Sequence, residues 1–227
     1  MRRTVIIARH GLTDFNNELR WQGLINKPPN KIGEKQSLIT AERIKEMVVD
    51  EKLSIKRVYT SYLKRASRFA VNIAKLLKLD IVVENGLAEY DLGEWDGKTF
   101  EEVARLRPYY HKQFKLDRSL LPPAPGEKTK SIAQEFEDSK KTAGKIINLE
   151  KENDILIVGH GGRLIQMIIA ITGWKLNNIN NLYLDNCSIT KILLPPEKPC
   201  FDPGDWTTTH PVLKLFNSTE HLKNLKN

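Results

Sequence analysis

The sequence lacks the long apolar runs and the cysteine pattern that mark membrane and disulfide-rich secreted proteins. No apolar run among the 227 residues approaches the roughly 18 needed to span a bilayer. The apolar run near the N-terminus, Val5–Ala8, has no small-residue cleavage pattern and does not predict a secretory signal. Cys187 and Cys200 form no C-x-x-C pair, which argues against a disulfide framework or a zinc site. We therefore expect a cytoplasmic protein without a membrane partner.

Motifs for nucleotides, metals and nucleic acids are also missing. The chain contains neither G-x-x-x-x-G-K-[ST] nor G-x-G-x-x-G, and neither H-x-x-x-H nor H-E-x-x-H. We therefore expect no metal and no other cofactor. Lys and Arg number 36 against 28 Asp and Glu, and the net charge of +8 is scattered without a nucleic-acid-binding motif. This charge fits either a solvated lysine-rich surface or the attraction of an anionic ligand, and nucleic acid is not an expected partner.

Short segments rich in β-branched residues alternate with longer amphipathic segments along the chain. Strands are predicted over Thr4–Ala8, Arg57–Thr60, Ile81–Glu84, Ile155–Gly159 and Ser188–Leu194. Helices are predicted over Gly33–Asp50, Tyr62–Leu79, Thr99–Phe114, Ser131–Leu149 and Arg163–Thr172. This alternation predicts an α/β fold of three layers, α/β/α, with a mostly parallel central sheet. We expect a single domain over residues 1–227, with a C-terminal appendage from about residue 195.

Two of the predicted strands end in a histidine flanked by glycine. The segment VIIARHGLTDFN places Arg9 and His10 at the end of the first strand, and DILIVGHGGRL places His160 at the end of a later one. Ligands in parallel α/β sheets bind beyond the carboxyl ends of the strands, so both histidines are expected at one site. A lone histidine there could be a nucleophile, a base, a metal ligand or a structural residue. The positive charge of the adjacent Arg9 requires an anionic partner and disfavours a bound metal cation. Asn16 adds a neutral hydrogen-bond donor nearby.

Six segments together resemble the motifs of the histidine phosphatase superfamily, the phosphoglycerate-mutase-like enzymes. They are RHGLTDFN, RWQGLINKPPNKIGEKQ, TSYLKRASRFA, LAEYDLGEWDGKTF, VGHGGRL and NCSIT, in the order of the family. The resemblance extends from Arg2 to about Leu194 and implies a phosphoglycerate-mutase-like fold.

The resemblance also implies a chemical role for each matching residue. His10 would be the nucleophile that carries a phosphoryl group on a ring nitrogen, which divides one hydrolysis into two displacements. Glu89 would protonate the leaving alcohol and then activate water. The remaining site residues would surround the phosphoryl oxygens, and they are Arg9, Arg65, His160, Asn16, Gln22 and Gly161. The implied ligand is a small-molecule phosphate ester, selected by the region Thr99–Lys130.

Three functions remain open at this stage, with a phosphatase favoured. The acid motif GLAEYDLGEWDG resembles the phosphatase branch, and the gap from Glu89 to His160 is 160 − 89 = 71 positions, which leaves little room for the insertion that mutases carry. A 2,3-bisphosphoglycerate-dependent phosphoglycerate mutase is the first alternative. A non-catalytic module that binds a phosphorylated ligand is the second. The sequence also leaves open whether the protein forms a homodimer.

Overall fold

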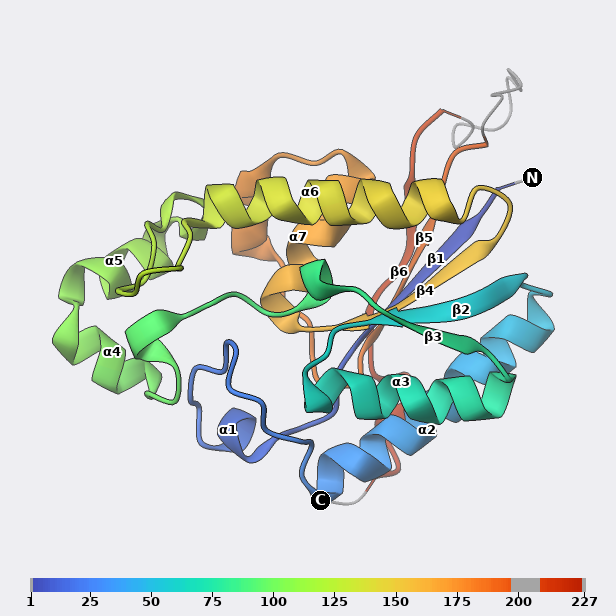
Figure 1. Ribbon diagram of the computed structural model, residues 1–227, viewed down its shortest axis with the longest axis horizontal. Helices are drawn as coiled ribbons and strands as arrows, with labels where there is room; N and C mark the ends of the chain where they lie inside the picture. The colour runs from blue at the N-terminus through green and yellow to red at the C-terminus, as the bar shows by residue number, and fades with distance from the viewer. Residues whose placement is uncertain (1, 197–208, 226–227) are drawn as a thin grey trace.

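A six-stranded sheet crosses the middle of the structure, with helices on both of its faces (Figure 1). The computed structural model describes residues 2–196 and 209–225, so Cys200 lies outside the described residues. The strands are β1 (Thr4–Arg9), β2 (Ile55–Thr60), β3 (Asp80–Val83), β4 (Asp154–Gly159), β5 (Ile189–Leu193) and β6 (Val212–Ser218). Their order in the sheet is β3-β2-β4-β1-β5-β6.

The sheet is mostly parallel, which confirms the predicted fold class. Strands β3, β2, β4 and β1 are parallel to one another, whereas β5 pairs antiparallel with β1 and β6 pairs antiparallel with β5. All five predicted strands are present, and their ends lie within two residues of the expected ones. Strand β6 was not predicted: it comes from the segment expected as an appendage, and it forms one edge of the same sheet. The single-domain organisation stays a prediction.

The helices match the predicted ones except for the short α1, which was not predicted, and in the middle of the chain. They are α1 (Asp14–Asn17), α2 (Lys31–Asp50), α3 (Lys64–Leu77), α4 (Phe100–Leu106), α5 (Pro108–Leu116), α6 (Ile132–Leu149) and α7 (Gly161–Thr172). The single helix predicted over Thr99–Phe114 is wrong, because the chain breaks between α4 and α5 at Arg107. Proline lacks the N–H that a continuing helix needs, and it forces Arg107 out of the helical region, to φ −141° and ψ 72°.

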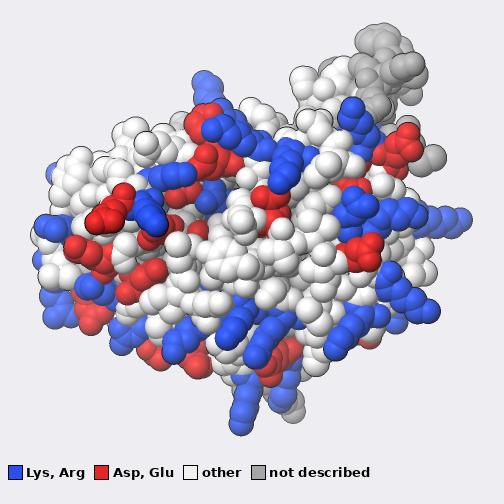
Figure 2. Space-filling view, viewed as in Figure 1, with Lys and Arg blue, Asp and Glu red and all other residues white. Residues whose placement is uncertain are grey.

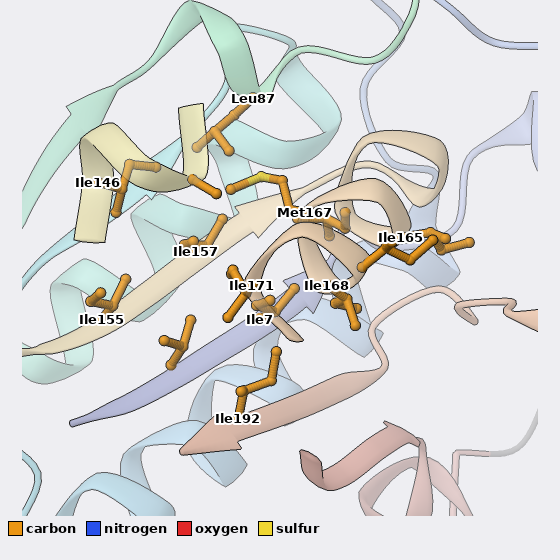
Figure 3. Packing of buried hydrophobic residues seen from close by; sticks show 14 of the residues in the cluster. Ile7, Leu87, Ile146, Ile155, Ile157, Ile165, Met167, Ile168, Ile171 and Ile192 are labelled. Atoms are coloured by element: carbon orange, nitrogen blue, oxygen red, sulfur yellow. The ribbon is translucent and has the colours of Figure 1, made fainter. Parts of the chain in front are cut away.

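Alternate residues along the strands pack against opposite helical layers, as the side-chain period of two requires. Ile6 and Ala8 of β1 belong to a core shared with α2 and α3. Val5 and Ile7 point the other way into a second core with α6 and α7, whose packing appears in Figure 3. This double burial explains why the strands read as continuous apolar runs. The same packing holds the ends of the strands in place, and these ends carry the polar residues described below.

The surface is charged but mixed. Figure 2 shows Lys and Arg side chains interspersed with Asp and Glu over the face in view, so the net charge of +8 forms no single patch there. None of the helices in residues 2–196 and 209–225 is long and apolar enough to cross a bilayer.

Candidate active site

The parallel pairing of β1 and β4 brings the two expected histidines together. Arg9 is in register with Gly159, and the backbone N–H of His10 donates to the Gly159 carbonyl at 3.0 Å. His10 and His160 therefore leave neighbouring strands at the same level, and their ring centroids lie 5.3 Å apart. Both rings are buried, at 3% and 0% exposure.

The His10 ring is held in one tautomer. Its Nδ1 lies 2.8 Å from the Gly11 carbonyl oxygen, which can only accept, so Nδ1 carries the proton and Nε2 keeps a lone pair. Burial lowers the pKa of His10 well below its usual value, and the charges of Arg65 and Arg9 lower it further. The ring is therefore a neutral imidazole at physiological pH, with an unprotonated nitrogen available for attack.

His160 and Arg65 form a buried layer beside His10 and do not line the cavity described below. Arg65 Nε donates to His160 Nδ1 at 3.0 Å, so His160 Nε2 carries the proton and donates to the Ser61 hydroxyl at 2.6 Å. The other guanidinium nitrogens of Arg65 donate to backbone carbonyls, among them Ile25 at 2.9 Å and Gly23 at 2.8 Å. Burial lowers the pKa of Arg65 to about 10, which still leaves it charged at neutral pH.

Ser61 was not singled out from the sequence. It follows β2 directly, and β2 pairs in parallel with β4, so its hydroxyl reaches the same sheet edge as the histidines. Two signals were available: Ser61 lies in the TSYLKRASRFA segment of the family resemblance, and it is a small polar residue right after a buried strand.

A cavity of about 450 Å³ opens over the strand ends. Six of the eight expected site residues line it, and we call them the histidine wall: Arg9, His10, Asn16, Gln22, Glu89 and Gly161. Among the described residues, Arg9 Nε and Gln22 Nε2 are buried there without a hydrogen-bond partner. Unpaired buried donors are costly, so this wall is suited to an anion that supplies the missing acceptors.

A second residue absent from the sequence-based set, Asn186, orients this wall. Its Nδ2 donates to the His10 carbonyl at 3.1 Å and to Asn16 Oδ1 at 3.2 Å. Asn16 Oδ1 also accepts from the backbone N–H and the hydroxyl of Thr13, at 3.2 and 3.0 Å. Because every donor points at the oxygen of the Asn16 side chain, its NH₂ group is left to face the cavity. The available sequence signals were the NCSIT segment of the family resemblance, which begins with Asn186, and the position of an amide residue next to the predicted strand 188–194.

The carboxylate of Glu89 is held by the N-terminus of α7. Its oxygens accept from the backbone N–H groups of Gly162 at 2.9 Å, Arg163 at 3.0 Å and Tyr90 at 3.1 Å. A Cβ at position 162 would lie 2.9 Å from a Glu89 oxygen and 2.7 Å from the Tyr90 ring, so only glycine permits this approach.

Arg163 fixes the segment that carries Glu89. Its Nε donates to the Ala88 carbonyl at 3.0 Å, and its Nη2 pairs with Glu135 of α6 at 2.6 Å. Sequence reasoning did not assign Arg163 a role, because a buried ion pair between distant segments leaves no local pattern.

Four further charged residues line the cavity, and they are Arg20, Asp91, Arg118 and Lys130. Most of the remaining lining is apolar and largely aromatic, and we call this part the aromatic wall. It includes Trp21, Trp95, Phe100, Phe114 and Leu121. The Trp21 ring centroid lies 4.2 Å from that of Phe100 and 5.5 Å from that of Phe114. In residues 2–196 and 209–225, no cluster of three or more His, Cys, Asp or Glu side chains could hold a metal ion.

The sequence matches the family model described as histidine phosphatase superfamily (branch 1), over residues 5–202. The chain belongs to this superfamily. The match covers most of the chain and includes every residue of the histidine wall, together with His160 and Arg65.

Relatives in this superfamily bear both phosphatase and mutase names. The chain is 28% identical to putative phosphoserine phosphatase 2 of Hydrogenobacter thermophilus, over 86% of this chain and 92% of that protein. It is 32% identical to phosphoglycerate mutase-like protein 4 of Arabidopsis thaliana, over 96% and 86% of the two chains. Among solved structures it is similar to phosphoserine phosphatase of Entamoeba histolytica in complex with 3-phosphoglyceric acid. That comparison gives 28% identity, a TM-score of 0.74 and coverage of 97% and 99%.

Proposed function

We propose that this protein is a phosphomonoesterase that hydrolyses small phosphorylated metabolites through a phosphohistidine intermediate on His10. The observation that carries the proposal is the state of that ring: neutral, with Nδ1 bonded to Gly11 and Nε2 facing a cavity lined by unpaired cationic and amide donors. Superfamily membership and the phosphatase names of its relatives support the same assignment.

In the first step, His10 Nε2 attacks the phosphorus and the bond from phosphorus to the ester oxygen breaks. The ring becomes cationic as the bond forms, and the Gly11 carbonyl accepts from Nδ1–H throughout. Arg9, Gln22 and the Asn16 amide meet the charge of the phosphoryl oxygens with fixed donors, which is the main requirement of phosphoryl transfer. Glu89 gives its proton to the departing alcohol.

In the second step, Glu89 takes a proton from water, the water oxygen attacks phosphorus, and the bond from phosphorus to Nε2 breaks. Inorganic phosphate leaves and the neutral imidazole is restored. We assign Arg65 to this site as a positive charge behind the nucleophile, and the neutral His160 ring, which accepts from Arg65 Nε at 3.0 Å, as part of the same layer. Direct contact of either side chain with the phosphoryl group requires exchange of one of its present bonds.

The test is to trap the intermediate with a ³²P-labelled phosphate ester. The native protein should retain label that resists alkali and is released by acid, and His10→Ala should retain none. His210→Ala is the matched control, because His210 is exposed and lies outside the cavity. Label on His10→Ala, or normal turnover by that variant, would contradict the proposal.

A second assay on the same preparation distinguishes a phosphatase from a mutase. Conversion of 3-phosphoglycerate to 2-phosphoglycerate is measured with and without 2,3-bisphosphoglycerate, beside phosphate release. We expect phosphate release to dominate. Isomerisation that is faster than hydrolysis and stimulated by the bisphosphate would replace the phosphatase assignment.

A further inference from the structure

The turn that carries Asn186 has a backbone conformation that its own sequence does not favour. Residues Asp185–Ser188 form a β-turn, in which the Ser188 N–H donates to the Asp185 carbonyl at 3.1 Å. Cys187, the third residue of the turn, is left-handed, at φ 55°. Glycine is the usual residue at such a position, because a Cβ disfavours positive φ. Contacts from outside the turn are therefore needed to stabilise it.

The inner side of this turn is bonded to the histidine wall. The Cys187 N–H donates to the carbonyls of Arg9 and His10, at 3.1 and 3.2 Å. The Asn186 side chain donates to the His10 carbonyl as well, and it orients the Asn16 amide as described above. A shift of the turn would therefore move several residues of the histidine wall together.

The outer side of the turn is held by Asn217, which belongs to the C-terminal segment, residues 209–225. Asn217 Oδ1 accepts from the Asp185 N–H at 2.7 Å, and Asn217 Nδ2 donates to Asp185 Oδ2 at 2.8 Å. Asn217 lies near the end of β6 and is itself left-handed, at φ 51°, which asparagine tolerates better than most residues. Its N–H donates to the Thr190 hydroxyl of β5 at 3.1 Å. Both ends of its amide are thus used on one residue of the turn, while its backbone is tied to the sheet.

A second anchor comes from His221, in the 3₁₀ turn Glu220–Leu222 that packs on α2. His221 Nε2 lies 3.2 Å from the Cys187 carbonyl oxygen and 2.9 Å from the Thr40 hydroxyl of α2. The Cys187 carbonyl can only accept, and the Thr40 hydroxyl gives its proton to the Gln36 carbonyl at 2.7 Å. His221 Nε2 therefore carries a proton and donates it to the turn.

We propose that Asn217 is a positioning residue for the reaction at His10, because it holds the Asp185–Ser188 turn and acts through Asn186 on the histidine wall. His221 supports the same turn from α2. This inference rests on the proposed function and gives the C-terminal segment a part in it. Asn217 is not among the residues that line the cavity, so its effect on the reaction passes through the turn.

The test exchanges the two partners of this bonded pair. Asn217→Asp keeps a residue that tolerates the left-handed backbone, but it sets a second carboxylate against that of Asp185. We expect kcat/KM for p-nitrophenyl phosphate and the affinity for orthovanadate, measured by calorimetry, to fall by about 10-fold each, the value of a lost hydrogen bond. The double variant Asp185→Asn/Asn217→Asp restores both bonds with donor and acceptor reversed, so it should recover most of the loss.

Leu213→Ala is the matched control, since Leu213 lies in the same strand β6 and packs against the core instead of the turn. This variant should lower the free energy of unfolding and leave the vanadate affinity of the folded protein unchanged. A purely structural role of Asn217 would give the same result as this control. His221→Ala should weaken vanadate binding by about 3-fold, whereas His221→Gln, whose amide can still donate to the Cys187 carbonyl, should retain it.

Vanadate binding also separates this inference from the proposed function. Absence of phosphate release by the native protein would count against the proposed function, while the vanadate affinities would still decide the role of Asn217. The inference would be overturned by an unchanged vanadate affinity in Asn217→Asp, by a double variant that binds no better than the single one, or by a native protein that does not bind vanadate.

Discussion

The two walls of the cavity are built from different kinds of structure. The histidine wall is centred on the end of the buried strand β1, which carries Arg9 and His10, and on the first turn of α7, which begins at Gly161. Backbone N–H groups of that turn also hold the carboxylate of Glu89. The aromatic wall comes from the short helices α4 and α5 and the loops around them, which lie beyond the strand ends at the left of Figure 1. If the proposed function holds, the phosphoryl chemistry takes place at the sheet edge, and the choice of substrate depends on a region with little support from the sheet.

The largest effect on the reaction rate is expected from a change at Glu89 in the histidine wall. Glu89→Gln keeps the size of the side chain but removes the proton that an alkoxide leaving group requires. We expect phosphoryl-enzyme formation from an alkyl phosphate to slow by about 10²–10⁴-fold, the usual contribution of general acid catalysis. Nitrophenolate leaves without a proton, so p-nitrophenyl phosphate should be affected far less.

The measurement is the pre-steady-state burst rate for both esters in both proteins. Steady-state turnover is not suitable, because Glu89 also acts as base in the second step and its loss there would affect both esters alike. An equal slowing of the burst for the two leaving groups would remove Glu89 from the acid role, and Asp91 would then be tested.

Part of the candidate site could be predicted from the sequence because some of its residues follow local rules. Arg9, His10 and His160 each stand directly after a continuous apolar run, and parallel strands deliver their carboxyl ends to one edge. The resemblance to the superfamily added Glu89 and Arg65, which no strand ending would have singled out. Asn186 and Ser61 were missed because their roles arise only when β5 and β2 are placed beside β1 and β4.

The aromatic wall was less predictable for a physical reason. Phe100 and Phe114 look like members of one amphipathic helix, and Pro108 divides them into two. Arg118, which lines the cavity beside this wall, belongs to no sequence motif, because its partners are the Leu182 carbonyl and the Phe114 ring. Such contacts depend on the packing of irregular segments, which sequence periodicity does not encode.

The second prediction concerns acid stability, which should reflect the histidine wall and its buried layer. His10 and His160 have pKa values well below the ordinary 6.5, chiefly because of burial and then because of Arg65. Between pH 6.5 and 5.5 the unfolded chain therefore binds protons that the folded chain does not. The free energy of unfolding should fall across this window by about 2 kcal/mol for the pair.

Denaturant melts at several pH values measure this slope. His160→Gln should lose about half of it, whereas His210→Ala should leave it unchanged because His210 is exposed. A stability that is flat from pH 6.5 to 5.5 in the native protein would show that the two rings take up protons in the folded state.

The third prediction tests whether Asn186 positions the histidine wall. Asn186→Ala removes the donor that fixes the Asn16 amide, so we expect kcat/KM to fall by about 10-fold and the affinity for vanadate to fall with it. Asn186→Asp should cost more, because a carboxylate cannot donate to Asn16 Oδ1 and repels the phosphoryl group. Asn177→Ala, an exposed change outside the cavity, is the control. Unchanged vanadate affinity in both Asn186 variants would mean that Asn16 is oriented without it.

The smallest expected effect lies on the aromatic wall, at Phe114. Phe114→Ala removes a ring 5.5 Å from Trp21 that lines the cavity without reaching a reacting atom. It should raise KM for naphthyl phosphate by about 3- to 10-fold, the value of one aromatic contact, with kcat unchanged. Methyl phosphate, which is too small to reach this wall, should be processed normally. Tyr109→Ala is the matched control, since Tyr109 lies on the same helix α5, is 66% exposed and does not line the cavity. A fall in kcat for both esters would instead mean that α5 supports the catalytic residues, and that the two walls act as one unit.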